Sequence, residues 1–91
     1  MKQVHIDGNK LQKIRYAREL SARTVADLIE SSPQYLMNLE EGKRPRTSTT
    51  YLARLGMVYS DSVVAEVIED PEQRAYFLAK AASRRQVLTN H

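Results

Sequence analysis

Residues 21–46 read SARTVADLIESSPQYLMNLEEGKRPR and contain two short helical patterns separated by one break. The first pattern follows Ser21, whose hydroxyl suits a helix N-cap because it can accept a hydrogen bond from a first-turn amide. The second begins at Ser32 and Pro33, since proline lacks the amide hydrogen that is unpaired at a first helical position. Gly42 is predicted to end it, because glycine adopts a left-handed backbone without steric cost. The pattern therefore predicts two short helices joined by a tight turn.

The second predicted helix, Pro33–Glu41, has the two faces that a DNA-reading helix needs. Leu36 and Leu39 recur at helical spacing and predict an anchored face. Helical geometry turns the remaining side chains outward: Gln34, Met37, Asn38 and Glu41, with Tyr35 at the flank. The major groove is about 12 Å wide and admits one helix, in which Gln and Asn can bond to adenine and Met can contact a thymine methyl. This face is therefore predicted to read bases.

A basic loop, Lys43-Arg44-Pro45-Arg46, follows the predicted reading helix. Residues 1–60 carry ten Lys and Arg against six Asp and Glu, whereas residues 61–91 carry four against five. The net charge of the whole chain is +3, so the basic excess lies entirely in the first part. Cations beside a reading helix are typical of contacts to DNA phosphates. The loop is predicted to hold the DNA backbone, and a merely solvated basic loop is the alternative.

The motifs between Leu11 and Tyr59 resemble the Cro and phage-repressor (XRE) class of helix-turn-helix proteins. The residues that carry the resemblance are Leu11, Ile14, Arg15, Leu20, Ser21, Val25, Ala26, Ile29, Ser32, Tyr35, Leu36, Leu39, Glu40, Gly42, Lys43 and Arg44. The resemblance implies a five-helix domain and a transcriptional regulator that is commonly dimeric. It also implies that Arg15 and Glu40 pair inside the domain and fix the first helix to the third.

The resemblance and the helix geometry together give a predicted set of DNA-contacting residues. That set is Arg23, Ser32, Gln34, Tyr35, Met37, Asn38, Lys43, Arg44, Arg46 and Thr47. Three positions depart from the family pattern: Ala22 replaces a frequent Gln, Glu30 a usual Gly, and Ser31 a usual aliphatic residue. Glu30 therefore adds a negative charge near the expected DNA face.

Residues 61–91 lie outside the resemblance and are predicted to be helical. Asp61-Ser62 starts a short helix that bears Val63–Ile68. Pro71 starts a long helix to about Leu88, because proline at the first position favours helix initiation. Apolar residues spread around most of this helix, and regulators with one reading helix normally pair across two half-sites. The predicted homodimer contacts are Val64, Ile68, Tyr76, Phe77 and Ala79, although such residues are more often core.

We predict an all-α fold in which a lambda-repressor-like DNA-binding domain over residues 1–60 carries a C-terminal helical extension over residues 61–91. The patch Val4-His5-Ile6 is either a short strand or an ordered arm. Ninety-one residues suit one compact core. The predicted function is sequence-specific binding of double-stranded DNA by a homodimeric regulator, a repressor of phage or prophage type. Alternatives are an antitoxin or adaptor that binds a partner protein through its C-terminal helices, and a DNA-architecture or recombination factor.

Composition argues against several other classes of protein. The chain has no cysteine, which excludes disulfides, thiolate zinc ligands and a cysteine nucleophile. His5 and His91 have no partner at metal-ligand spacing, so no enzyme, metal, cofactor or small-molecule ligand is expected. No apolar run approaches the roughly 20 residues of a membrane helix, and the first residues lack a signal-peptide core. A cytoplasmic protein, nucleoid-associated in a bacterial host, is expected.

Overall fold

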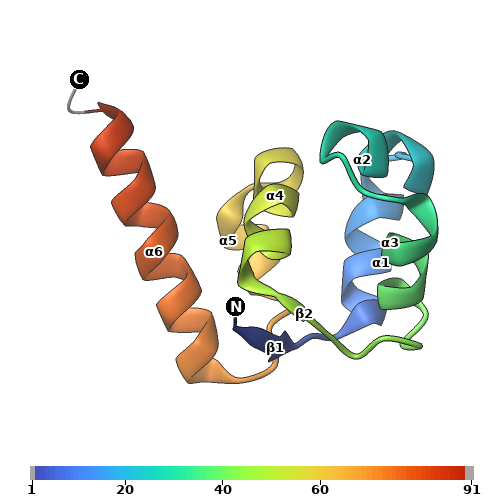
Figure 1. The fold of residues 1–91 in the computed structure, drawn as a ribbon, viewed down its shortest axis with the longest axis horizontal. Coiled ribbons are helices and arrows are strands. Elements are labelled where there is room, and N and C mark those ends of the chain that lie inside the picture. The colour runs from blue at the N-terminus through green and yellow to red at the C-terminus, as the bar shows by residue number, and fades with distance from the viewer. Residues whose placement is uncertain (1, 90–91) are drawn as a thin grey trace.

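A computed structural model describes residues 2–89, with side chains through Arg84. The described chain is mostly helical, and its helices flank one small antiparallel sheet (Figure 1). The elements are β1 Gln3–His5, α1 Gly8–Ala17, α2 Ala22–Leu28, α3 Pro33–Glu40, β2 Arg46–Ser48, α4 Thr49–Tyr59, α5 Asp61–Ala65 and α6 Pro71–Thr89. A small helical domain is as predicted, but the sheet corrects the all-α prediction.

Hydroxyl caps fix where α2, α3 and α4 begin. The side chains of Ser21, Ser32 and Ser48 each accept a hydrogen bond of 3.0 Å from the backbone N–H three residues later. Each bond satisfies an N–H that no helical carbonyl can reach. Beyond α3, Gly42 has a φ of 80°, the left-handed conformation that ends the helix. The predicted starts of α2 and α3 and the stop at Gly42 are therefore confirmed.

The N-terminal arm forms strand β1 and joins two distant parts of the chain. On one side it pairs with β2 in a register that places Val4 opposite Thr47, and both side chains are buried. On the other side, Ile6 forms an antiparallel bridge with Ile68. The backbone N–H of Asp7 also donates to the carbonyl of Val67 at 2.8 Å. The arm thus holds the segment before α6 against the segment after the basic loop.

One buried core runs through both predicted parts of the chain. Its members are Val4, Ile6, Leu11, Val25, Ile29, Leu36, Leu39, Tyr51, Leu52, Leu55, Tyr59, Val64, Ala65, Val67, Ile68 and Phe77. Val64 and Ile68 are fully buried and Phe77 is 3% exposed, so intramolecular packing already removes them from solvent. Their prediction as dimer contacts is wrong. The boundary at residue 60 divides no core, and α5 ends at Ala65 rather than continuing through Ile68.

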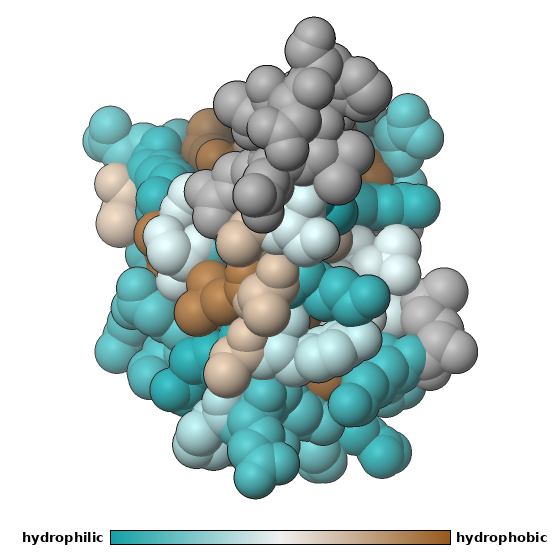
Figure 2. Space-filling view, turned by 90° about the vertical axis from the view of Figure 1, so that its left-hand side faces the viewer, coloured by the Kyte–Doolittle hydropathy of each residue, from teal (hydrophilic) through white to brown (hydrophobic). Residues whose placement is uncertain are grey.

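Helix α6 flanks the molecule on the side away from α1, α2 and α3 (Figure 1). It buries Phe77 and Ala81 against the core. Tyr76 and Ala79, also predicted as dimer contacts, are exposed on this helix. Figure 2 faces this side and shows a strip of apolar residues between hydrophilic borders. One face of α6 therefore packs into the core, and another face, which bears Tyr76 and Ala79, is exposed to solvent.

Candidate nucleic-acid interface

The connection between α2 and α3 is tight and passes through a left-handed residue. Glu30 has a φ of 56°, a conformation that favours glycine. The backbone N–H of Ser31 then donates to the carbonyl of Ala26 at 2.8 Å, which closes the end of α2. The turn forms even though a glutamate occupies its left-handed position.

A buried ion pair anchors α3 to α1. Arg15 Nε donates to Glu40 Oε2 and Arg15 Nη2 to Glu40 Oε1, both at 2.8 Å. The third nitrogen, Nη1, donates to the carbonyl of Leu20 at 2.9 Å. The hydrogen bonds to Glu40 raise the pKa of the Arg15 guanidinium. Two parallel bonds fix orientation as well as distance, so the expected Arg15–Glu40 pair holds α3 rigidly.

The opposite face of α3 carries polar side chains at the surface. Leu36 and Leu39 are fully buried, whereas Gln34 and Met37 are exposed and Asn38 is half-buried. Gln34 Nε2 donates to Asn38 Oδ1 at 2.9 Å, one helical turn away. This bond leaves Gln34 Oε1 as an acceptor and Asn38 Nδ2 as a donor for an outside group. The two carboxamides are thus linked before any ligand arrives.

Tyr35 is half-buried and braces the region around the basic loop from within. Its hydroxyl lies 2.9 Å from Thr47 Oγ1, within hydrogen-bond distance. Its ring meets Tyr51 edge-on, with centroids 4.9 Å apart. The guanidinium carbon of Arg44 lies 5.1 Å from the Tyr35 ring centroid, where the ring attracts a cation. Tyr35 therefore connects α3 to β2, α4 and the loop.

This packing corrects one predicted DNA contact and restricts the geometry of a second. Thr47 is fully buried opposite Val4 in the sheet, so its side chain does not reach the surface. Its prediction as a DNA contact is wrong. Tyr35 bonds Thr47 inside the domain, and its hydroxyl can still donate to a phosphate when Thr47 is the donor in that bond.

The exposed cations of the loop lie next to the N-terminal arm. Lys43, Arg44 and Arg46 are exposed, and with Gln3 and Pro45 they line a shallow hollow of about 350 Å³. Lys43 Nζ lies 3.0 Å from Glu41 Oε1, but an exposed pair of this kind is weak and easily exchanged. Arg23 and Ser32, two further predicted contacts, are exposed at the starts of α2 and α3.

The sequence prediction did not include Gln3 in this surface. Pairing of β1 with β2 brings Gln3 beside the loop, with His5 opposite Arg46 in the sheet. The stretch Val4-His5-Ile6, which favours a strand, was the available signal, because a short strand needs an edge to pair with. Its partner strand, however, is polar and only three residues long.

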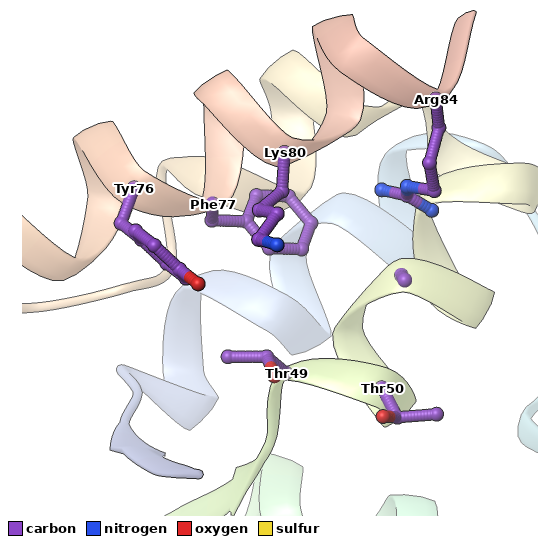
Figure 3. Close-up of a pocket in the computed structure, with 7 residues that line it drawn as sticks. Thr49, Thr50, Tyr76, Phe77, Lys80 and Arg84 are labelled. Carbon is purple, nitrogen blue, oxygen red and sulfur yellow. The ribbon is translucent and has the colours of Figure 1, made fainter. Parts of the chain in front are cut away.

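A second concave feature lies between α4 and α6, away from α3 (Figure 3). The cleft measures about 360 Å³ and is lined by Thr49, Thr50, Ala53, Tyr76, Phe77, Lys80 and Arg84. The nitrogens Nζ of Lys2 and Lys80 lie 5.3 and 5.7 Å from the Tyr76 ring centroid. In Figure 3 the side chains of Tyr76 and Lys80 extend from α6 toward the start of α4. The exposed part of Tyr76 thus lies among cations.

Metal-binding clusters and membrane-spanning helices do not occur in the part of the chain that the structure describes. Within residues 2–89 no three His, Cys, Asp or Glu side chains are grouped to hold a metal ion. No described helix is long and apolar enough to cross a membrane. His91 lies outside the described residues. Compared with known proteins, the chain matches no family model, no curated protein and no solved structure.

Proposed function

We propose that the protein binds double-stranded DNA sequence-specifically, with α2 and α3 as a helix-turn-helix of the Cro and phage-repressor class. In this proposal α3 lies in the major groove of the DNA. The observation that carries the proposal is a rigidly anchored α3 whose free face is polar and adjoins exposed cations. Base reading needs side chains held in place, and the buried Arg15–Glu40 pair supplies that rigidity from behind.

The Gln34–Asn38 pair is the proposed base-reading group. The edge of adenine in the major groove offers a donor at N6 and an acceptor at N7. Gln34 Oε1 can accept from N6 while Asn38 Nδ2 donates to N7, because their mutual bond leaves both atoms unused. Met37 is exposed on the same helix face and can contact the methyl group of a neighbouring thymine. We therefore infer a preference for A·T pairs within each half-site.

The exposed cations are the proposed contacts to the DNA backbone. Lys43, Arg44 and Arg46 approach one strand from the loop after α3, and Arg23 approaches from the start of α2. Tyr35 has a positioning role in this proposal, because its ring holds the guanidinium of Arg44. Each phosphate neutralised by one of these cations steepens the dependence of log affinity on log salt by about 0.9.

The biological role that fits this design is transcriptional regulation by a homodimer, most simply a repressor that occupies its operator. One reading helix covers only a few base pairs, so two copies are needed to specify an operator. The proposal places the protein in the cytoplasm, where its DNA is found.

Selection of bound sequences from random duplex DNA at near-physiological salt tests the proposal. The expected result is a palindromic consensus with half-sites about ten base pairs apart, centre to centre, and A·T pairs within each half. Purified protein with Asn38→Ala should select a consensus that has lost one of those positions. Binding without any enriched sequence, or no binding to duplex DNA, would contradict the proposed function.

A further inference from the structure

Two large apolar side chains at the ends of α2 and α4 are strongly exposed to solvent. Met57 is 87% exposed and Leu28 is 65% exposed. They share one hollow of about 280 Å³, which Ile29, Glu30 and Arg54 also line. In Figure 1, α2 and the yellow C-terminal end of α4 both lie at the upper edge, whereas β2 and the start of α4 lie below. We call these five residues the Leu28–Met57 patch.

The core does not require either of the two exposed side chains. Helix α2 already buries Val25 and Ala26, and α4 buries Leu52 and Leu55 together with both of its tyrosines. Single exposed apolar residues are ordinary on protein surfaces, whereas two that share one hollow form a candidate interaction site. The Leu28–Met57 patch is therefore a candidate binding surface for a protein partner.

The charges in the patch are balanced and match a second copy of the same surface. Glu30 and Arg54 both line the hollow, and neither has an ion-pair partner among the described residues. A two-fold contact is self-complementary: if one residue meets another across it, the reverse contact also forms. Glu30 of one copy can therefore face Arg54 of the other, twice, while the apolar side chains meet about the axis. A patch with charges of one sign only would repel its copy across the same axis.

We propose that the Leu28–Met57 patch binds a second copy of this chain and forms a symmetric homodimer. The inference rests on the proposed function for the purpose of the dimer. Its contact residues differ from the five predicted from the sequence, of which three are buried. A patch of five residues is small beside a standard interface of about 1,600 Å². The dimer is accordingly weak in free solution, with a dissociation constant on the order of 100 µM, and DNA half-sites bring the copies together.

Sedimentation equilibrium of the full chain without DNA, up to about tenfold above that dissociation constant, tests the association. The wild-type protein is expected to dimerise, and Met57→Glu is expected to weaken association at least about tenfold, since its carboxylate would be buried at the contact. The melting temperature should be unchanged because Met57 is outside the core. Tyr76→Glu on α6 is the matched control and should dimerise normally. A monomeric wild type, or loss of the dimer in Tyr76→Glu but not in Met57→Glu, overturns the proposal.

Exchanging the charges of Glu30 and Arg54 tests whether these two residues pair across the proposed dimer contact. Glu30→Lys places two cations opposite each other, and Arg54→Glu places two carboxylates opposite each other, so each variant alone should be monomeric. An equimolar mixture of the two variants should recover dimers, because both contacts across the resulting heterodimer then join opposite charges. At one contact the introduced lysine faces the introduced glutamate, and at the other the native Arg54 faces the native Glu30. A mixture that stays monomeric counts against the proposed pairing.

The dimer and the proposed function can fail separately in these experiments, because the association is measured without DNA. A dimer that forms through the Leu28–Met57 patch but does not bind duplex DNA refutes the proposed function alone. Sequence-specific DNA binding by a chain that does not form this dimer refutes the interface alone.

Discussion

Asn38 is linked to Gln34 by a hydrogen bond of 2.9 Å on the exposed face of α3, so a substitution there tests base reading directly. Asn38→Ala removes a donor to one base pair and frees Gln34 from its partner. We expect the preference for that base pair to fall by about 1–3 kcal/mol, measured as the affinity ratio between the consensus site and a single-base variant. Gln73→Ala on α6 is the control and should leave the ratio unchanged. An equal loss of affinity on both sites would mean that Asn38 only holds the backbone.

Tyr59 has a hydroxyl that is buried without a hydrogen-bond partner, on a side chain that is 1% exposed. A buried polar group without a partner costs roughly 1–3 kcal/mol. Tyr59→Phe removes that group and keeps the ring, so the free energy of unfolding should rise by about 1 kcal/mol at neutral pH, measured by urea denaturation. Tyr16→Phe, at a tyrosine that is 59% exposed, is the control and should change little.

The same residue gives the protein a pH dependence at alkaline pH. Burial raises the pKa of Tyr59 from 10.0 to about 12. Below pH 10 the Tyr59 phenol is neutral in both the folded and the unfolded protein. Above pH 10 it ionises first in the unfolded protein, so the free energy of unfolding falls as the pH rises through the folded-state pKa. The loss should be on the order of 2 kcal/mol between pH 10 and about pH 12. Tyr59→Phe should lose less stability than the wild type over this range, and an identical loss in both would contradict the assignment.

Glu30 stores backbone strain at the turn between α2 and α3, with a φ of 56°. A left-handed residue other than glycine destabilises the folded state by about 1–2 kcal/mol. Glycine removes this strain, but it also raises the conformational entropy of the unfolded chain, which offsets part of the gain in stability. Glu30→Gly should therefore raise the free energy of unfolding by about 0.5–1 kcal/mol in urea denaturation. Glu41→Gly is the matched control, because Glu41 has a φ of −83° and no such strain to relieve. A gain in both variants, or in neither, would refute the strain argument.

Helix α3 depends on α1 through the Arg15–Glu40 pair, and this dependence is testable at the scale of the two elements. Arg15→Ala leaves the carboxylate of Glu40 buried without a cation, which typically costs about 3–5 kcal/mol. We expect a loss of stability of that order and a loss of DNA binding that follows the fraction unfolded. Lys13→Ala, at an exposed cation on the same helix, should keep both properties. An unchanged melting temperature in Arg15→Ala would show that the pair anchors nothing.

The elements that could be predicted from sequence are those with local causes. Ser21 and Ser32 cap their helices through an N–H only three residues away, so the signal lies within one short window. Strand β2 has no such signal, because it is polar and forms only by pairing with the distant N-terminal arm. Thr47 lies in a run of hydroxyl residues, a composition that predicts solvent exposure. Its burial follows from the long-range pairing of β1 with β2. The polar face of α3 was predictable because the helical period alone sets it.

At the scale of the whole molecule, apolar content does not distinguish a core from an interface. Val64, Ile68 and Phe77 fit both roles in the sequence, and only the packing of residues 61–81 onto α4 and the arm assigns them to the core. Leu28 and Met57 lie within two residues of core residues along the chain, and only the three-dimensional structure shows that their side chains are outside the core. Long-range contacts therefore decided what the local patterns left open.

The shared core makes a strong prediction about the chain as one folding unit. A fragment of residues 1–60 lacks Val64, Val67, Ile68 and Phe77, all buried against the remainder. Burying each such side chain contributes about 1.5–3 kcal/mol, and the sum is comparable to the total stability of a small domain, about 5–15 kcal/mol. We expect this fragment to be unfolded by circular dichroism and by NMR shift dispersion. A chain that ends at Arg84 is the control, because it keeps every core residue among the side chains that the structure describes, and it should fold. A folded 1–60 fragment would instead restore the boundary at residue 60, and would mean that residues 61–81 cover a core that is already complete.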